Sequence, residues 1–384
     1  MKAPGWLALL VVLIALAACG GALPPAEAPA TAADAGSFVP SGFDRLVMLT
    51  NVTEQLILPG HEALVQALQA LETAAVSFAG APDQARLDAV QDAWLAANLA
   101  RMALLPYRLG PVDDSLLHNR LDNRPPRRTF IDDEILAADT PIDAAYIDSI
   151  GSSSVGLGAM EYLLFDPAGG DAAVLEAFTG AEHAGRRREL LAALAQAATP
   201  KAEALLRIWS AEGDNYAQAF IAADMDEGEY QGSMNMLANQ IIADVEDIVS
   251  SRLGKPLGKR TNGETRPDLV EAPYSGASLP RIVATLEAEK AAFTGGSGPG
   301  LDDYLDFIGA MSGEEPLSQV IVRQFDAALA ALRAIDGPLE TAVQSNPAQV
   351  ESAYQETLSL LTLLKADMVN QLGLTLTFND NDGD

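Results

Sequence analysis

Apolar residues spaced three and four positions apart recur along most of this chain of 384 residues, in runs separated by proline and glycine. In residues 83–105, Leu87, Val90 and Trp94 follow this spacing, which places them on one face of a helix. Pro106 ends the run because proline disrupts a helix interior. Aromatic residues make up only 6% of the chain, which disfavours a sheet protein. The pattern therefore predicts an all-α fold.

The helical runs fall into two stretches of similar length. Charged and turn residues interrupt them near 212–230, which predicts two helical bundles, 41–212 and 213–384, packed side by side. Residues 106–158 form an irregular insert of the kind that often carries function. Very little β-structure is expected. Only 374–378 alternates between apolar and polar residues as a strand does.

The charge and the scarcity of histidine and cysteine exclude several classes of protein. The chain has 53 Asp and Glu against 24 Lys and Arg, a net charge of −29, so a nucleic-acid partner is not expected. Three histidines and one cysteine rule out a disulfide framework and a zinc finger. Any metal site must therefore depend mainly on carboxylates, the ligands that hard cations prefer.

The N-terminus has the features of a bacterial lipoprotein. Residues 1–18 contain an uncharged apolar run that is too short to cross a bilayer comfortably and suits a signal peptide. The run ends in Leu-Ala-Ala-Cys19-Gly20, which resembles a lipobox, where the cysteine is lipidated. Residues 19–40 are rich in alanine and proline and are expected to be a lipidated, flexible tether. Resemblance to sorted lipoproteins implies anchoring in the outer membrane, facing the periplasm or the cell surface. A plain signal peptide with a chance cysteine is the alternative.

One segment resembles a known motif. Residues 156–161, Gly-Leu-Gly-Ala-Met-Glu, resemble the Gly-x-His-x-x-Glu motif of the imelysin family. Residues 271–279, Glu-Ala-Pro-Tyr-Ser-Gly-Ala-Ser-Leu, are similar to a second segment of that family, and 372–384 to its typical ending. The resemblance spans about 43–384. It implies two helical bundles that meet at a cleft holding the motif, in a family described both as metallopeptidase-like and as iron-associated.

This chain departs from the motif at one position. A histidine and a glutamate three positions apart emerge on one face of a helix, where they could share a metal or a water. Gly158 replaces the histidine, while Gly156 and Glu161 are kept. A catalytic zinc takes about three protein ligands plus water, so no catalytic residue is expected. The position beside Glu161 is expected to be vacant, with room for a restored histidine at little cost in stability.

The resemblance implies a set of cleft residues: Gly156, Gly158, Glu161, Arg101 and His118. Among them Glu161 is the expected metal ligand, holding a divalent cation such as iron weakly. Two of these residues have a simpler interpretation. Glu161 is equally an acid stabilised in the first turn of a helix, and Arg101 could lay its stem along the surface. His61 is expected at a helix start, in a surface or capping role.

Three functions are compatible with these features. The first is a non-catalytic binding or accessory lipoprotein linked to the uptake of iron or another metal. The second is a divergent metallopeptidase in which His118 supplies a missing ligand. The third is a scaffold whose cleft binds a protein partner. Because Gly158 replaces the motif histidine, the first and third are favoured. In all three the membrane is a partner, through the lipid on Cys19.

Overall fold

The computed structural model describes residues 42–223 and 232–376, which belong to one compact unit. The expected signal peptide, Cys19 and the tether lie outside the described residues. Within the described ranges, no helix is both long and apolar enough to cross a membrane. The division between bundles at 212 and 213 stays a prediction.

The structure confirms the predicted all-α class. The N-terminal group consists of α1 (Arg45–Val52), α2 (Leu58–Gly80), α3 (Gln84–Met102), α4 (Pro111–Asp114), α5 (Leu117–Leu121), α6 (Arg128–Phe130), α7 (Ala144–Ser149), α8 (Gly156–Leu164), α9 (Gly170–Thr179), α10 (Ala184–Trp209) and α11 (Tyr216–Ala222). The C-terminal group consists of α12 (Ser233–Asp247), α13 (Ser278–Thr294), α14 (Leu301–Phe307), α15 (Leu317–Arg333), α16 (Leu339–Ser345), α17 (Pro347–Thr362) and α18 (Val369–Leu372).

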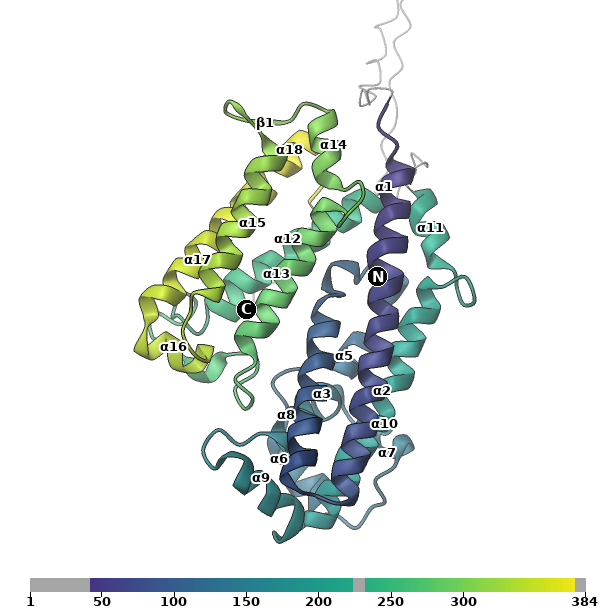
Figure 1. Cartoon of the computed structure of the whole chain (residues 1–384), viewed down its shortest axis with the longest axis vertical. Helices are drawn as coiled ribbons and strands as arrows, with labels where there is room; N and C mark the ends of the chain where they lie inside the picture. Colours follow the sequence, from purple (N-terminus) through teal and green to yellow (C-terminus); the bar gives the residue numbers. More distant parts are fainter. Residues whose placement is uncertain (1–41, 224–231, 377–384) are drawn as a thin grey trace, which may run out of the picture. The chain divides into compact units, whose positions relative to one another are not determined.

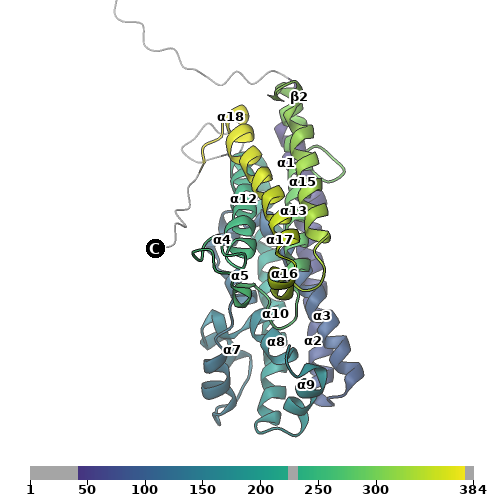
Figure 2. The ribbon, with the colours of Figure 1, turned by 90° about the vertical axis from the view of Figure 1, so that its left-hand side faces the viewer.

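Each group has its own helix packing. In the N-terminal group α2 packs on both α3 and α10, and in the C-terminal group α15 packs on α13 and α17 (Figures 1 and 2). The groups meet where α3 and the 3₁₀ helix η2 (Leu105–Tyr107) contact α12 and α13. We call this contact the seam. Buried apolar side chains from both groups form one continuous core.

The helix α3 shows how the local sequence determines an element. The side chain of Asp83 caps it by accepting a hydrogen bond from the amide of Arg86 (2.9 Å). Leu87, Val90 and Trp94 are fully buried, as their spacing predicts. The face that they form covers the core of the N-terminal group, so burial of apolar area stabilises the helix that the spacing predicts.

The small amount of β-structure lies elsewhere than expected. Two short antiparallel strands, β1 (Met311–Ser312) and β2 (Glu315–Pro316), pair Met311 with Pro316 and Ser312 with Glu315. Residues 374–376 form no strand, and 377–378 lie outside the described residues. The chain leaves α18 at Gly373, whose φ of 63° is the left-handed conformation typical of a helix end. Alternation over so few residues has no neighbouring strand to pair with, and this explains the error.

Candidate functional site

The motif helix α8 begins at a glycine that the backbone requires. Gly156 has a φ of +69°, and a Cβ atom there would lie 2.3 Å from the carbonyl oxygen of Leu121. Only glycine fits both conditions. The close approach lets Asp122 and Gly156 form an isolated antiparallel bridge. The insert is thereby held against the start of α8, and Asp122 is placed beside the motif.

Glu161 is completely buried, and both of its carboxylate oxygens are bonded. Oε1 accepts hydrogen bonds from the amides of Tyr274 (3.1 Å) and Ser275 (3.0 Å), and from the Ser275 hydroxyl (2.7 Å). Oε2 forms an ion pair with Arg124. Glu161 and Arg124 belong to the N-terminal group, whereas Tyr274 and Ser275 precede α13. The motif acid therefore joins the two helix groups.

Asp122 is a second buried acid at the same place and binds three arginines. Its Oδ1 accepts a hydrogen bond from Nε of Arg124 (2.8 Å). Its Oδ2 accepts from Arg281 (2.9 Å) and from Arg101 (3.4 Å). Burial alone would raise the pKa of Asp122, but the three guanidinium groups bring it well below the usual range. Asp122 is therefore ionised in the folded protein.

Arg281 of α13 connects these acids to the other helix group across the seam. It donates to the side-chain oxygen of Asn98 on α3 and to Oε2 of Glu271 (3.2 Å). Burial lowers its pKa, but Glu271 and Asp122 raise it above the ordinary value, so the charge is retained. Arg252 extends the network, with Nη1 3.7 Å from Oε1 of Glu271. The result is a buried set of paired charges in which each acid has an arginine partner. We call it the motif network; its acids are Glu161, Asp122 and Glu271, and its arginines are Arg101, Arg124, Arg252 and Arg281.

Gly158 does not leave the vacancy expected beside Glu161. A Cβ atom there would lie 3.2 Å from the carbonyl oxygen of Asn123. It would also lie 3.5 Å from Cγ of Arg124 and 3.5 Å from Oδ1 of Asp122. Position 158 is therefore closely packed rather than vacant, and the stability of a histidine there stays a prediction. The insert folds its own side chains over this face of α8, which no pattern within the helix could indicate.

The other expected site residues make no direct hydrogen bond or ion pair with Glu161 within the described residues. Arg101 is buried and contacts Asp122, and burial lowers its pKa to about 10, partly offset by Asp122. His118 is buried, and neither of its ring nitrogens has a hydrogen-bond partner among the residues that the structure describes. His61 is fully buried in the same way, so its expected surface or capping role was wrong. Burial lowers the pKa of both imidazoles, that of His61 to about 3.

The residues at the motif do not fit a metal ion. Glu161 is the one acid of the motif, and its oxygens already bind Arg124, Ser275 and two backbone amides. Across residues 42–223 and 232–376, no three His, Cys, Asp or Glu side chains lie close enough together to hold a metal. A cation at Glu161 would also face the guanidinium of Arg124. The geometry gives no support to Glu161 as a metal ligand.

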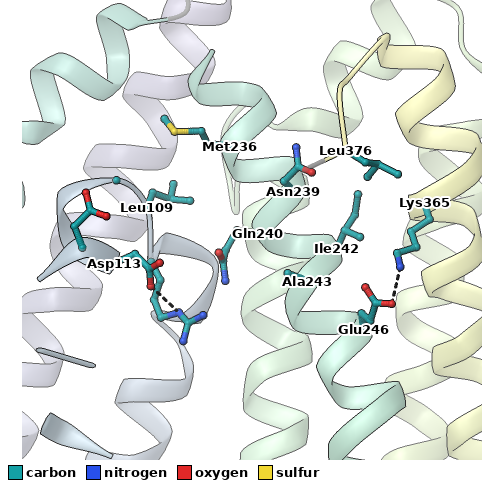
Figure 3. A pocket seen from close by; sticks show the side chains of 13 residues that line it. Leu109, Asp113, Met236, Asn239, Gln240, Ile242, Ala243, Glu246, Lys365 and Leu376 are labelled. Carbon is teal, nitrogen blue, oxygen red and sulfur yellow. Dashed lines mark hydrogen bonds and ion pairs between the residues drawn. The ribbon is translucent and has the colours of Figure 1, made fainter. Parts of the chain in front are cut away.

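A pocket opens on another part of the seam. Its volume is about 300 Å³, and it lies between the chain after η2 and helix α12 (Figure 3). Charged pairs stand at two sides, Arg108 with Asp113 (3.9 Å) and Lys365 with Glu246 (2.6 Å). Gln240 lies between these pairs. The pocket is the more accessible polar feature, whereas the motif network is closed.

Several residues of the network were not identified from the sequence. Arg124, Asp122, Asn98 and Arg281 were not among the residues expected at the site. One signal was available. Polar residues recur every four positions along α13 at Arg281, Thr285 and Glu289, and all three are buried. Such a stripe indicates a polar contact between packed helices.

Comparison with known proteins finds several that are similar to this chain. The family model for imelysin matches residues 57–366. Iron-regulated protein A of Synechococcus elongatus is 25% identical over 329 residues, covering 81% of this chain and 83% of that protein. The crystal structure of an imelysin-like protein from Psychrobacter arcticus superposes with a TM-score of 0.70 at 16% identity, covering 88% of this chain and 99% of that one. A structure from Parabacteroides distasonis gives a TM-score of 0.70 at 18% identity, covering 87% and 97%. At these identities the two structures show the fold alone.

Proposed function

The chain belongs to the imelysin family, and from this premise we propose that it is a non-catalytic binding or accessory protein of the bacterial envelope. It is anchored to the outer membrane through lipid on Cys19 and takes part in the uptake of iron or another metal. A lipid anchor leaves the helical unit free to meet a partner at the membrane surface.

The state of Glu161 carries the non-catalytic part of the proposal. A general base or a metal ligand needs a free oxygen directed at substrate, water or metal. Both oxygens of Glu161 are bonded within the protein, and position 158 contributes no side chain. His118 was the candidate for a missing ligand, but Arg101 and Arg108 are its charged neighbours. A cation bound there would be repelled. This arrangement supports a structural role for the motif.

The link to iron is supported by the relative from Synechococcus elongatus, which is named iron-regulated protein A. The acidity of the chain is compatible with an envelope protein that meets cations, since 53 acidic residues face 24 basic ones.

A protease assay tests the non-catalytic part. The purified protein, incubated with unfolded casein and zinc or iron(II), should release no peptides above a chelator-treated sample. Chelator-sensitive cleavage that is lost in both Glu161→Gln and His118→Ala would overturn the proposal and establish a divergent peptidase. Cleavage that persists in both variants would identify a contaminating protease, so the proposal would stand.

Iron limitation tests the accessory role. Protein abundance should change when iron is chelated from the medium, and a deletion strain should accumulate less iron than its parent. Complementation with the full chain should restore the iron content. Unchanged abundance together with unchanged iron content would reject the link to iron and favour a scaffold with another partner.

A further inference from the structure

The polar stripe on α13 leads from the motif network to a second buried group at the seam. Glu289 lies two turns beyond Arg281 on the same face of the helix. Its side chain is fully buried, and neither carboxylate oxygen accepts a hydrogen bond from any donor in the part of the chain that is described. An ionised carboxylate in this position would be expensive to bury. Glu289 therefore needs a different explanation from Glu161.

The explanation is a neighbouring carboxyl group. Asp244 of α12 is buried, and its carboxyl lies within hydrogen-bond reach of Glu289. Two ionised carboxylates have only acceptors, so a hydrogen bond between them requires a proton on one of them. Gln240 donates to Oδ2 of Asp244 (2.9 Å), which favours the ionised form on that side. The proton then belongs on Glu289.

The titratable side chains in and around the Asp244–Glu289 pair come from four elements. Asp244 comes from α12 and Glu289 from α13. Tyr107 ends η2, Arg108 follows it, and Arg252 lies in the π-helical segment η6 (Ile248–Leu253). Burial, followed by the charge of Asp244, raises the pKa of Glu289 well above its ordinary value, against a smaller effect of Arg252 and Arg108. Burial also raises the pKa of Asp244.

Neither arginine replaces the proton. Arg252 is bound to Asp247 (2.7 Å) and to the hydroxyl of Thr285 (3.0 Å). Arg108 has its Nε 3.9 Å from Asp113, at the pocket. Burial also raises the pKa of the Tyr107 phenol, so it stays neutral. The pair therefore has cations nearby, yet within residues 42–223 and 232–376 neither carboxyl forms an ion pair.

The geometry points to a proton-binding site made by Asp244 and Glu289, which holds one proton at neutral pH and joins α12 to α13 beside the pocket. Gln240 connects the two places, because it lines the pocket and also donates to Asp244 (Figure 3). When the proton leaves, two negative charges share a buried site next to Tyr107. Their repulsion and their need for water favour separation of α12 from α13.

Unfolding measured against pH tests this site. A folded-state pKa raised above the unfolded value gives stability that is complete below the unfolded pKa and is lost as pH rises toward the folded pKa. Between about pH 5 and pH 8, the folded-to-unfolded ratio of the wild type should therefore fall by up to about tenfold per pH unit relative to Glu289→Gln. Glutamine keeps the size and still donates to Asp244. Glu287→Gln is the matched control, because Glu287 lies on the same helix, α13, but is exposed and paired with Arg333.

Infrared spectroscopy gives an independent measurement on the wild type. A protonated-carboxyl stretch should be present at about pH 7, should disappear at higher pH, and should be absent from Glu289→Gln at every pH above the range of ordinary carboxyls. The absence of this band from the wild type would overturn the proposal even if Glu289→Gln does not fold. Parallel pH profiles for wild type and Glu289→Gln, or no protonated carboxyl in the wild type at about pH 7, would overturn the proposal.

Discussion

Replacing Gly158 by histidine restores the family motif and is expected to destabilise the protein. The backbone at this position does not require glycine, because its φ is not in the left-handed region. The obstacle is space. A Cβ atom would already lie 3.2 Å from the Asn123 carbonyl oxygen and 3.5 Å from Cγ of Arg124, and the imidazole ring must go beyond it. The side chain of Arg124 has to move to admit the ring.

The magnitude follows from what Arg124 leaves behind. Its departure removes the cation from the fully buried Glu161, and an uncompensated buried charge typically costs about 3–5 kcal/mol. The gain in helix propensity from glycine to histidine is only a few tenths of a kcal/mol. We therefore expect Gly158→His to lower the free energy of unfolding by roughly 3 kcal/mol or more. Gly158→Ala is the control. It adds only a Cβ atom and gains up to about 1 kcal/mol of helix propensity, so it should stay within about 1 kcal/mol of wild type.

Guanidinium unfolding, followed by circular dichroism and by the fluorescence of the buried Trp94, measures both variants. Calorimetric titration with zinc, iron(II) and copper should be done on the same samples. Wild-type stability in Gly158→His, combined with tight metal binding, would refute the reasoning. It would mean that Arg124 leaves Glu161 at little cost and that the network is an adaptable site.

Three further outcomes are expected. Arg281→Met should lower the unfolding free energy by about 3–5 kcal/mol, since Asp122 and its neighbours lose a buried cation. Arg323→Met, at an exposed ion pair, is the control and should change it by less than about 1 kcal/mol. Equal effects of the two substitutions in denaturant titrations would contradict a special role for the network. Burial lowers the pKa of His61 to about 3, so the folded protein excludes a proton that the unfolded chain binds below about pH 6.5. The stability that His61 contributes is therefore complete above that pH and is lost as pH falls. In thermal melts from about pH 7 to pH 4, the melting temperature of His61→Leu should fall less steeply with acid than that of the wild type. Cys19→Ser should move the protein from the membrane to the soluble fraction and abolish labelling by fatty acid; retention on the membrane would disprove the anchor.

The fold class was predictable because helix formation leaves its signal within a few residues. The spacing of Leu87, Val90 and Trp94 already specifies the face that is buried, and Asp83 marks where the helix begins. The motif acid was also identifiable, because Glu161 stands at a fixed distance from Gly156 within one short segment. These are local relations, and they hold whatever the rest of the chain does.

The partners of Glu161 and Asp122 were decided by the tertiary structure. Arg281 and Asp122 are 159 positions apart, and the amide of Ser275 is 114 positions from Glu161. No periodicity relates such residues. The packing of α13 against α3 brings them together, and the low dielectric of the seam makes their pairing strong. The sequence determined which residues could ionise, whereas the buried seam determined which arginines each acid would bind and why Gly158 has no room beside it.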